Sequence, residues 1–259
     1  MEDLEERTGG FDPTFFSNLV RFEENSFWFK SRNELLFWTY ETFFLQAKRF
    51  FEIGMGTGYV LAGFQKRFPS LELHGSEFFV EGLVHAAARL PNAQLYQMDA
   101  RSLPFTDHFD VIGAFDVLEH IEEDRLVLSE MCKALRAGGG VIITVPQHKF
   151  LWSVLDQVSH HKRRYSRKGI VEKLEEAGFQ PIYISSFVTL LFPIMLLSRI
   201  FRRKADSGVY DLRSSPEYKI GAFLDKALGG IMRFERWMMR KGARFGFGGS
   251  LLVVAKKNE

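Results

Sequence analysis

The sequence predicts an α/β protein whose seven-stranded, mostly parallel sheet carries helices on both faces. Two observations support this fold: short apolar runs alternate with helical patterns from residue 48 onward, and a glycine-rich turn follows the first run. Repeated strand–helix units favour parallel pairing with right-handed crossovers. Strands are expected near 49–53, 71–75, 94–98, 109–115, 140–145, 180–187 and 250–255, with helices at 13–22, 30–47, 57–67, 79–89, 123–136 and 167–177.

The glycine-rich turn makes the fold Rossmann-like and indicates a nucleotide-type ligand. Residues 49–59 read RFFEIGMGTGY, so three glycines, Gly54, Gly56 and Gly58, stand between an apolar run and a helical pattern. Glycine permits positive φ and lets backbone approach a ligand closely. A dinucleotide fingerprint would place its third glycine one position later, where Tyr59 stands. A structural turn that binds nothing remains the alternative.

Acidic residues follow the next two expected strands. Glu77 comes about 20 residues beyond the glycine turn, where a carboxylate can accept hydrogen bonds from ribose hydroxyls. Asp99 and Ala100 follow the third strand, and the aspartate could accept from an adenine amino group. The alternatives are a helix-cap neighbour for Glu77 and a turn former for Asp99. Three strand ends in the correct order favour the ligand site.

These motifs resemble a known enzyme family. The pattern E-x-G-x-G-x-G, which begins at Glu52, is similar to motif I of class I S-adenosylmethionine-dependent methyltransferases. The stretches 109–120 and 135–146 resemble the fourth strand with its loop and the fifth strand of type 11 methyltransferases, which include ubiquinone-biosynthesis O-methyltransferases. The resemblance spans residues 27–186 and implies S-adenosyl-L-methionine as cofactor. It implies a cofactor site formed by Arg32, Glu52, Gly54, Gly56, Gly58, Glu77, Asp99, Ala100 and Phe115.

Arg32 enters this set because related enzymes use an arginine before motif I to meet the cofactor carboxylate. A solvated charge on a helix is the alternative for Arg32. The segment 146–165, PQHKFLWSVLDQVSHHKRRY, follows the fifth strand and is expected to supply the chemistry. In the resembling branch it carries an aspartate, a histidine five residues later, a basic pair and a tyrosine. The matching residues, taken as catalytic candidates, are Asp156, His161, Arg164 and Tyr165, with Arg163 completing the basic pair.

Methyl transfer needs alignment of the acceptor and exclusion of water. A hydroxyl acceptor also needs a base, and histidine suits neutral pH, with an aspartate fixing its tautomer. The alternative is that His161 and Arg164 only tie a loop to the sheet. His120 lies near the same strand end, where it could instead cap the loop. No metal is expected, because His148, His160, His161 and Asp156 lack a recognised ligand spacing.

Length and composition favour one elaborated domain over the 259 residues, with 46% apolar and 25% charged residues. We expect an N-terminal helical cap over 1–47, a Rossmann-like core over 48–187 and 249–256, and a helical insertion over 188–248. The insertion is far longer than an ordinary hairpin loop. The acidic N-terminus lacks the apolar stretch of a signal peptide, so a cytoplasmic location is expected, with peripheral membrane contact as an option.

The charge is unevenly distributed, although the net charge is only +2. Residues 1–130 hold 11 Lys and Arg against 22 Asp and Glu, whereas residues 131–259 hold 23 against 10. The apolar run 187–201 is too short to span a bilayer, and Arg202, Arg203 and Lys204 follow it. Residues 187–204 therefore predict contact with an anionic membrane surface. The alternatives are that the segment is a lid over the core, and that the uneven charge only makes the two halves of the chain attract each other.

The sequence thus predicts a methyltransferase acting on a hydrophobic or anionic small molecule, such as a lipid, a quinone precursor or a lipid-linked sugar. One alternative is a nucleic-acid methyltransferase, which the basic half permits. It is disfavoured because residues 115–118 read FDVL where such enzymes carry an N/D-P-P-Y-type motif. A catalytically silent, cofactor-binding regulator of a membrane complex is the other alternative. The sequence does not predict the oligomeric state.

Overall fold

A seven-stranded sheet forms the centre of the computed structural model, which describes residues 15–203 and 221–258. The strand order is β3-β2-β1-β4-β5-β7-β6. Strands β1 to β5 pair in parallel, whereas β7 lies antiparallel between β5 and β6. The predicted fold class is therefore confirmed. The strands are β1 (Arg49–Ile53), β2 (Glu72–Glu77), β3 (Gln94–Gln97), β4 (Phe109–Phe115), β5 (Leu135–Pro146), β6 (Phe179–Phe187) and β7 (Ser250–Lys257).

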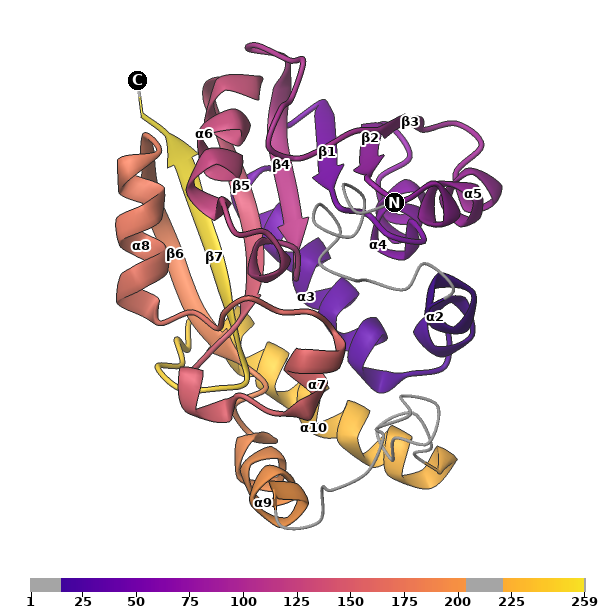
Figure 1. Cartoon of the computed structure of the whole chain (residues 1–259), viewed down its shortest axis with the longest axis vertical. Helices are drawn as coiled ribbons and strands as arrows, with labels where there is room; N and C mark the ends of the chain where they lie inside the picture. The colour runs from indigo at the N-terminus through magenta and orange to yellow at the C-terminus, as the bar shows by residue number, and fades with distance from the viewer. Residues whose placement is uncertain (1–14, 204–220, 259) are drawn as a thin grey trace, which may run out of the picture.

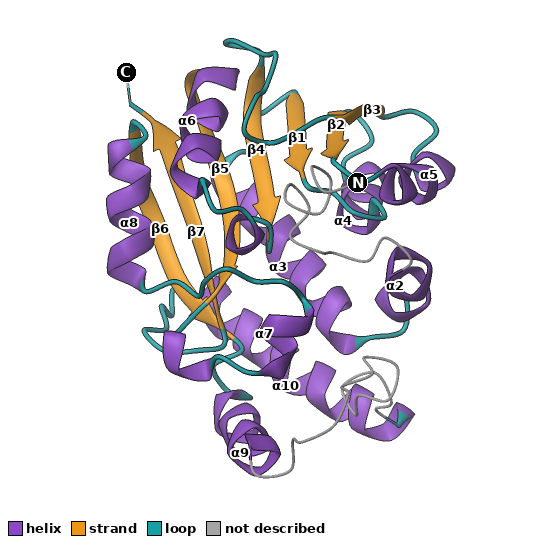
Figure 2. Ribbon diagram, viewed as in Figure 1, coloured by secondary structure: helices purple, strands orange, loops and turns teal. Residues whose placement is uncertain are grey.

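Helices cover both faces of the sheet (Figures 1 and 2). One layer consists of α3 (Phe27–Phe43), α4 (Tyr59–Arg67), α5 (Val80–Arg89) and α10 (Ala222–Arg240). The opposite layer consists of α6 (Asp124–Ala134) and α8 (Arg167–Glu176). The remaining helices lie at the edges or in connections: α2 (Phe15–Glu23), α7 (Val154–Val158), α9 (Phe192–Arg203) and the short 3-10 turns η1 (Leu118–His120) and η2 (Lys149–Leu151).

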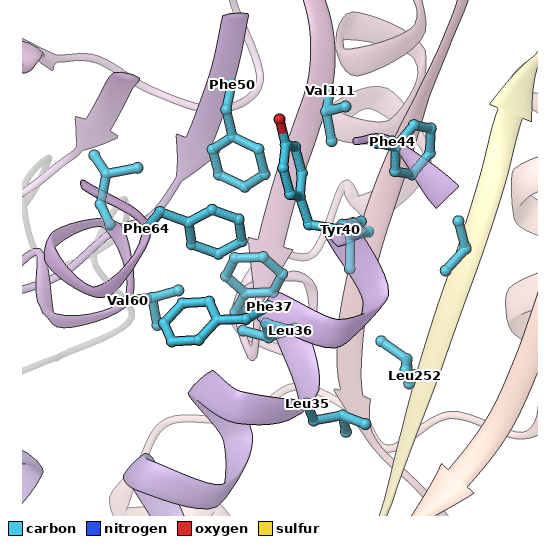
Figure 3. Packing of buried hydrophobic residues seen from close by; sticks show 14 of the residues in the cluster. Leu35, Leu36, Phe37, Tyr40, Phe44, Phe50, Val60, Phe64, Val111 and Leu252 are labelled. Atoms are coloured by element: carbon cyan, nitrogen blue, oxygen red, sulfur yellow. The ribbon is translucent and has the colours of Figure 1, made fainter. Parts of the chain in front are cut away.

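Alternating side chains of the strands fill two cores, one on each face of the sheet. In β1, Phe50 enters the core under α3 and α4, whereas Phe51 enters the core under α6. Figure 3 shows the first core, in which the rings of Phe50 and Phe64 stack with centroids 4.5 Å apart. Tyr40 of α3 meets Phe64 edge-on at 5.6 Å. This packing holds the first strand and its two covering helices in one unit.

Several element ends differ from the sequence expectations. Strand β5 begins at Leu135 rather than residue 140, because Leu135 already pairs with Phe109 before the register shifts. Helix α6 therefore ends at Ala134. Helix α3 begins at Phe27 because Ser26 caps it, its hydroxyl accepting from the N–H of Trp28. The short helix α7 was not expected from the sequence. The expected helix over 13–22 is α2, and residues 13–14 lie outside the described residues.

The segment between β6 and β7 contains two helices, α9 and α10, with residues 204–220 outside the described part of the chain. Lys204 belongs to that part, and the side chains of Arg199, Arg202 and Arg203 are likewise not described. Helix α10 packs along α3 on the face opposite α6 and α8. Among the described residues, no helix combines the length and the apolar character that crossing a bilayer requires.

Candidate active site

The glycine turn lies at the carboxyl end of β1, where its three glycines all have positive φ, from 56° to 74°. A Cβ on Gly54 would lie 2.8 Å from Val117, and one on Gly58 would lie 2.8 Å from Leu90. Among the described residues, a Cβ on Gly56 would meet the Phe16 ring alone, at 3.7 Å. Packing therefore requires the first and third glycines, whereas the second has more space beside it in this part of the chain.

Glu77, the last residue of β2, is tied to this turn. One carboxylate oxygen accepts the N–H of Gly56 at 2.9 Å, and the other accepts the N–H groups of Phe78 and Phe79 at 2.8 and 3.0 Å. Burial raises the pKa of Glu77, although these three backbone donors act in the opposite direction. The carboxylate thus connects the ends of two neighbouring strands, where open α/β sheets bind their ligands.

Two further side chains from the predicted cofactor set, Glu52 and Arg32, lie inside the site. Glu52 is the penultimate residue of β1 and is 2% exposed, and one of its carboxylate oxygens has no partner among the described residues. Burial raises its pKa to about 8, despite the nearby Arg32 guanidinium. Arg32 donates from Nη1 to Asp116 at 2.6 Å, while its buried Nε has no partner in the part of the chain that the structure describes. Unpaired buried polar atoms at one place indicate a site that a polar ligand completes.

The raised pKa of Glu52 leads to a testable pH dependence. Its ordinary value is 4.5 and its folded value is about 8, so the folded protein holds a proton that the unfolded chain releases between these pH values. The stability that this proton contributes is therefore lost as pH rises from 4.5 towards 8. Replacing Glu52→Gln removes the ionisable group and should gain about 2–4 kcal/mol relative to wild type across that range.

Thermal melting of both proteins at roughly pH 5 and roughly pH 8, near the two ends of that interval, measures this difference. Glu41→Gln serves as the control, because Glu41 is partly exposed and pairs with Arg67 on the surface. Parallel melting curves for wild type and Glu52→Gln at the two pH values would contradict the prediction.

The remaining cofactor candidates line the neighbouring strand ends. Asp99 follows β3 and forms an ion pair with Arg101 at 2.7 Å, and Arg101 also reaches Glu123 at 3.1 Å. The carboxylate predicted to meet adenine is therefore already held in place by a guanidinium. Ala100 is next in the chain and is partly buried. Phe115 ends β4, is 5% exposed and belongs to the core under α3 and α4.

Helix α2 is fastened to the glycine turn by a buried cluster that the sequence analysis missed. The Thr57 hydroxyl donates to Glu23 at 2.6 Å, and Arg89 donates from Nη1 to both Glu23 at 2.7 Å and Thr57 Oγ1 at 2.6 Å. Glu23 is 4% exposed and Thr57 is fully buried. No local pattern around Glu23 signals this contact, because it joins residues far apart in sequence.

A second group of candidates lies after β5 and is organised by Asp156. This fully buried carboxylate accepts from His161 Nδ1 at 3.0 Å and from Arg164 Nε at 2.7 Å. It also completes a capping box with Ser153 at the start of α7. Burial alone would raise the pKa of Asp156, but the hydrogen bonds from His161 and Arg164 outweigh it and hold the pKa well below its usual range.

His161 meets two residues of the loop after β4, Glu119 and His120. The His120 and His161 rings are perpendicular, with centroids 4.7 Å apart. Burial next to His161 lowers the pKa of His120 to about 3, so this ring is neutral. Glu119 is fully buried, and within residues 15–203 and 221–258 neither of its carboxylate oxygens has a hydrogen-bond partner. Burial beside Asp116 raises its pKa.

One ligand atom from each of Glu119, His120 and His161 lies within 4.8 Å of the other two. Two imidazoles and a carboxylate at such distances could hold a divalent cation as well as an acceptor group. No metal was predicted from the sequence, because the histidines of residues 146–165 and Asp156 lack a ligand spacing by themselves. The Glu119–His120 pair directly after the fourth strand supplies the other two possible ligands.

Tyr165 does not join the other catalytic candidates. Its hydroxyl donates to Asp124 at 2.7 Å inside the core under α6 and α8, and Lys173 binds the same carboxylate. Burial, followed by the contact with Asp124, raises the pKa of the tyrosine far above its ordinary value. Arg163 also pairs with Asp124, at 3.0 Å. The structure therefore brings Asp156, His161 and Arg164 together and separates Tyr165 from them.

Sequence comparison identifies the central segment. Residues 51–143 match the family model described as a methyltransferase domain. Over 102 residues the chain is 35% identical to phosphatidylethanolamine N-methyltransferase of Cereibacter sphaeroides, covering 37% of this chain and 49% of that protein. Over 135 residues it is 27% identical to a probable S-adenosylmethionine-dependent methyltransferase of Mycolicibacterium smegmatis, covering 50% and 51%. The chain thus spans about half the length of these curated relatives.

Solved structures agree on the fold. A methyltransferase of Thermotoga maritima, described as a possible histamine N-methyltransferase, superposes with a TM-score of 0.60 at 15% identity over 95% of this chain and 97% of that chain. Phosphoethanolamine N-methyltransferase 2 of Haemonchus contortus, bound to S-adenosyl-L-methionine, gives 0.54 at 20% identity over 82% and 49%. The chain therefore carries a methyltransferase domain of the class I, S-adenosylmethionine-dependent type.

Proposed function

We propose that the protein transfers a methyl group from S-adenosylmethionine to a hydrophobic or anionic small molecule, with a lipid, a quinone precursor or a lipid-linked sugar as the acceptor classes. The observation that supports this most is the meeting of two residue groups at the carboxyl ends of the strands. Glu77 and the glycine turn form one group, and His161 with Asp156 forms the other. Arg32 pairs with Asp116 and acts against the raised pKa of both Glu52 and Glu119.

The residues present fit the cofactor. The open side of Gly56 allows close approach of a ligand to the backbone, and the Glu77 carboxylate lies beside it to meet ribose hydroxyls. The unpartnered Nε of Arg32 can take a carboxylate. When bound, S-adenosylmethionine supplies an electrophilic methyl group on a sulfonium sulfur. The chain itself supplies alignment, exclusion of water and a place for the proton that the acceptor loses.

His161 is suited to receive that proton. A neutral imidazole that donates its Nδ1–H to Asp156 keeps the Nε2 lone pair for an acceptor O–H or N–H. Its side chain is 16% exposed, so an acceptor can reach it, whereas Asp156 is fully buried. Arg164 donates to the Asp156 carboxylate and, from Nη1, to the Gln147 carbonyl at 3.1 Å. These bonds tie the segment that carries His161 to the end of β5.

The function is tested by incubating the purified protein with methyl-labelled S-adenosylmethionine and fractionated lipid and quinone-precursor extracts. Transfer of label to an extractable apolar or anionic compound is the expected result. Transfer only to nucleic acid would contradict the acceptor class. Cofactor binding without transfer to any fraction would favour a silent regulator.

Membrane contact through residues 187–204, with the protein peripheral on the cytoplasmic side, is part of the same proposal. It is supported by α9, where Ile194 and Leu197 are 57% and 54% exposed. We expect Ile194→Ser combined with Leu197→Ser to weaken binding to anionic vesicles about tenfold, because each replacement removes a buried apolar side chain from the bound state. Co-sedimentation at low and high salt measures the change, and unaltered binding would contradict membrane contact through α9.

A further inference from the structure

The outward side of α10 exposes large apolar side chains. Phe223, Phe234 and Trp237 are 88%, 53% and 52% exposed. The rings of Phe234 and Trp237 stack with centroids 5.6 Å apart at an interplanar angle of 15°. Spacings of 11 and 14 residues from Phe223 put all three on one side of the helix. A stacked pair of exposed aromatic rings, with a third exposed ring farther along the same side of the helix, indicates a binding partner.

The opposite side of α10 already has its packing partner. Met232 and Met239 are 2% exposed and belong to the core that includes α3. Burial of this side explains why α10 is held on the protein. It does not explain Phe223, Phe234 and Trp237, which lie on the other side of the helix. Helix α10 is therefore apolar on two sides, and residues 15–203 and 221–258 cover only one of them.

The exposed basic residues and the acidic residues of α10 also lie on different sides of the helix. Lys226, Arg233 and Arg240 recur every seven residues along the edge of the aromatic surface, and all three are exposed. The two acidic residues of the helix accept hydrogen bonds from other segments of the protein. Asp225 accepts the N–H of Phe27 at 2.8 Å, and the buried Glu235 accepts the N–H of Leu190 at 2.8 Å. The surface that faces away from the protein is thus aromatic and basic.

We propose that the outward face of α10, formed by Phe223, Lys226, Arg233, Phe234, Trp237 and Arg240, docks on an anionic lipid bilayer. A helix lying in the membrane interface inserts aromatic residues at headgroup depth and places basic residues against anionic headgroups. The complementary charge favours a bilayer over a second copy of this chain, whose own α10 surface is equally basic. Docking is independent of the methyl acceptor, although α10 packs on α3, which carries Arg32 into the active site.

The experiment uses the whole protein and vesicles of phosphatidylcholine alone or mixed with phosphatidylglycerol. Wild type should sediment with the mixed vesicles at low salt and less at high salt. The Phe234→Ser/Trp237→Ser double variant should lose about tenfold or more in affinity. Lys226→Gln and Arg233→Gln should each lose about fivefold at low salt, and little at high salt.

The matched control is Leu45→Ser with Val84→Ser, which removes two side chains that are 58% and 64% exposed elsewhere on the surface. It should bind vesicles like wild type. Melting curves and S-adenosylhomocysteine calorimetry confirm that each variant is folded, so failure of docking is distinguishable from failure of the cofactor site. The proposal is overturned if wild type stays in the supernatant or if Phe234→Ser/Trp237→Ser binds normally. Loss of self-association in that variant, with vesicle binding unchanged, would also overturn it.

Discussion

Replacing Glu77→Ala should weaken binding of S-adenosylmethionine and S-adenosylhomocysteine about 10- to 100-fold. The carboxylate makes three hydrogen bonds to backbone N–H groups, including that of Gly56 in the glycine turn. Its loss leaves these donors unpaired and removes the acceptor that we assign to the ribose hydroxyls. Each unsatisfied buried polar group costs about 1–3 kcal/mol, which corresponds to the expected loss in affinity. Isothermal titration calorimetry with both ligands measures it.

The control for this prediction is Glu81→Ala, which removes an exposed carboxylate from the first turn of the neighbouring α5. Its affinity for the cofactor should equal that of wild type. NAD is a second comparison, because Tyr59 replaces the third glycine of a dinucleotide fingerprint. Tight NAD binding by wild type, or normal S-adenosylhomocysteine binding by Glu77→Ala, would refute the assignment of this site.

The parts of the fold that could be predicted depend on local patterns. Strand β4 was expected at 109–115 and lies there, because a continuous apolar run between polar turns has few other interpretations. Strand β5 was placed too short, because Gly138 has φ of 74° and the strand passes through a glycine-rich stretch that reads as a turn. Pairing with Phe109 decides the start of that strand, and a single sequence does not reveal the partner.

The candidate site shows the same division. The positions of Glu77 and the glycine turn were predictable because each lies at the end of a strand that the hydrophobic pattern indicates. Glu23 and Arg89 were not, since their contact with Thr57 depends on how two distant helices meet at the turn. Tyr165 was assigned with its neighbours because the family resemblance implied it. Its hydroxyl instead satisfies Asp124 in the core, because a side chain one residue from Arg164 points in a different direction.

Replacing His161→Ala should lower turnover about 10²- to 10⁴-fold while leaving cofactor affinity unchanged, as expected when a general base is removed. The fold should survive, because Asp156 keeps its bonds to Arg164 and to the Ser153 cap. The measurement is kcat on the acceptor identified by methyl labelling, together with calorimetry of S-adenosylhomocysteine. Lys162→Ala is the neighbouring control. That residue is exposed, and its backbone N–H donates to the Glu119 carbonyl, a bond that the substitution retains.

Adding imidazole to the His161→Ala protein distinguishes a role of His161 in proton transfer from a purely structural role in its loop. If His161 takes the acceptor's proton, free imidazole can enter the vacated space and restore part of the turnover, since the partly exposed side chain leaves a path from solvent. Rescue should be absent in wild type and in Lys162→Ala. If His161 only ties residues 156–164 to the loop after β4, the alanine variant should melt at lower temperature and imidazole should not restore its activity. A lowered melting temperature without rescue would therefore assign His161 to the structure of that loop rather than to proton transfer.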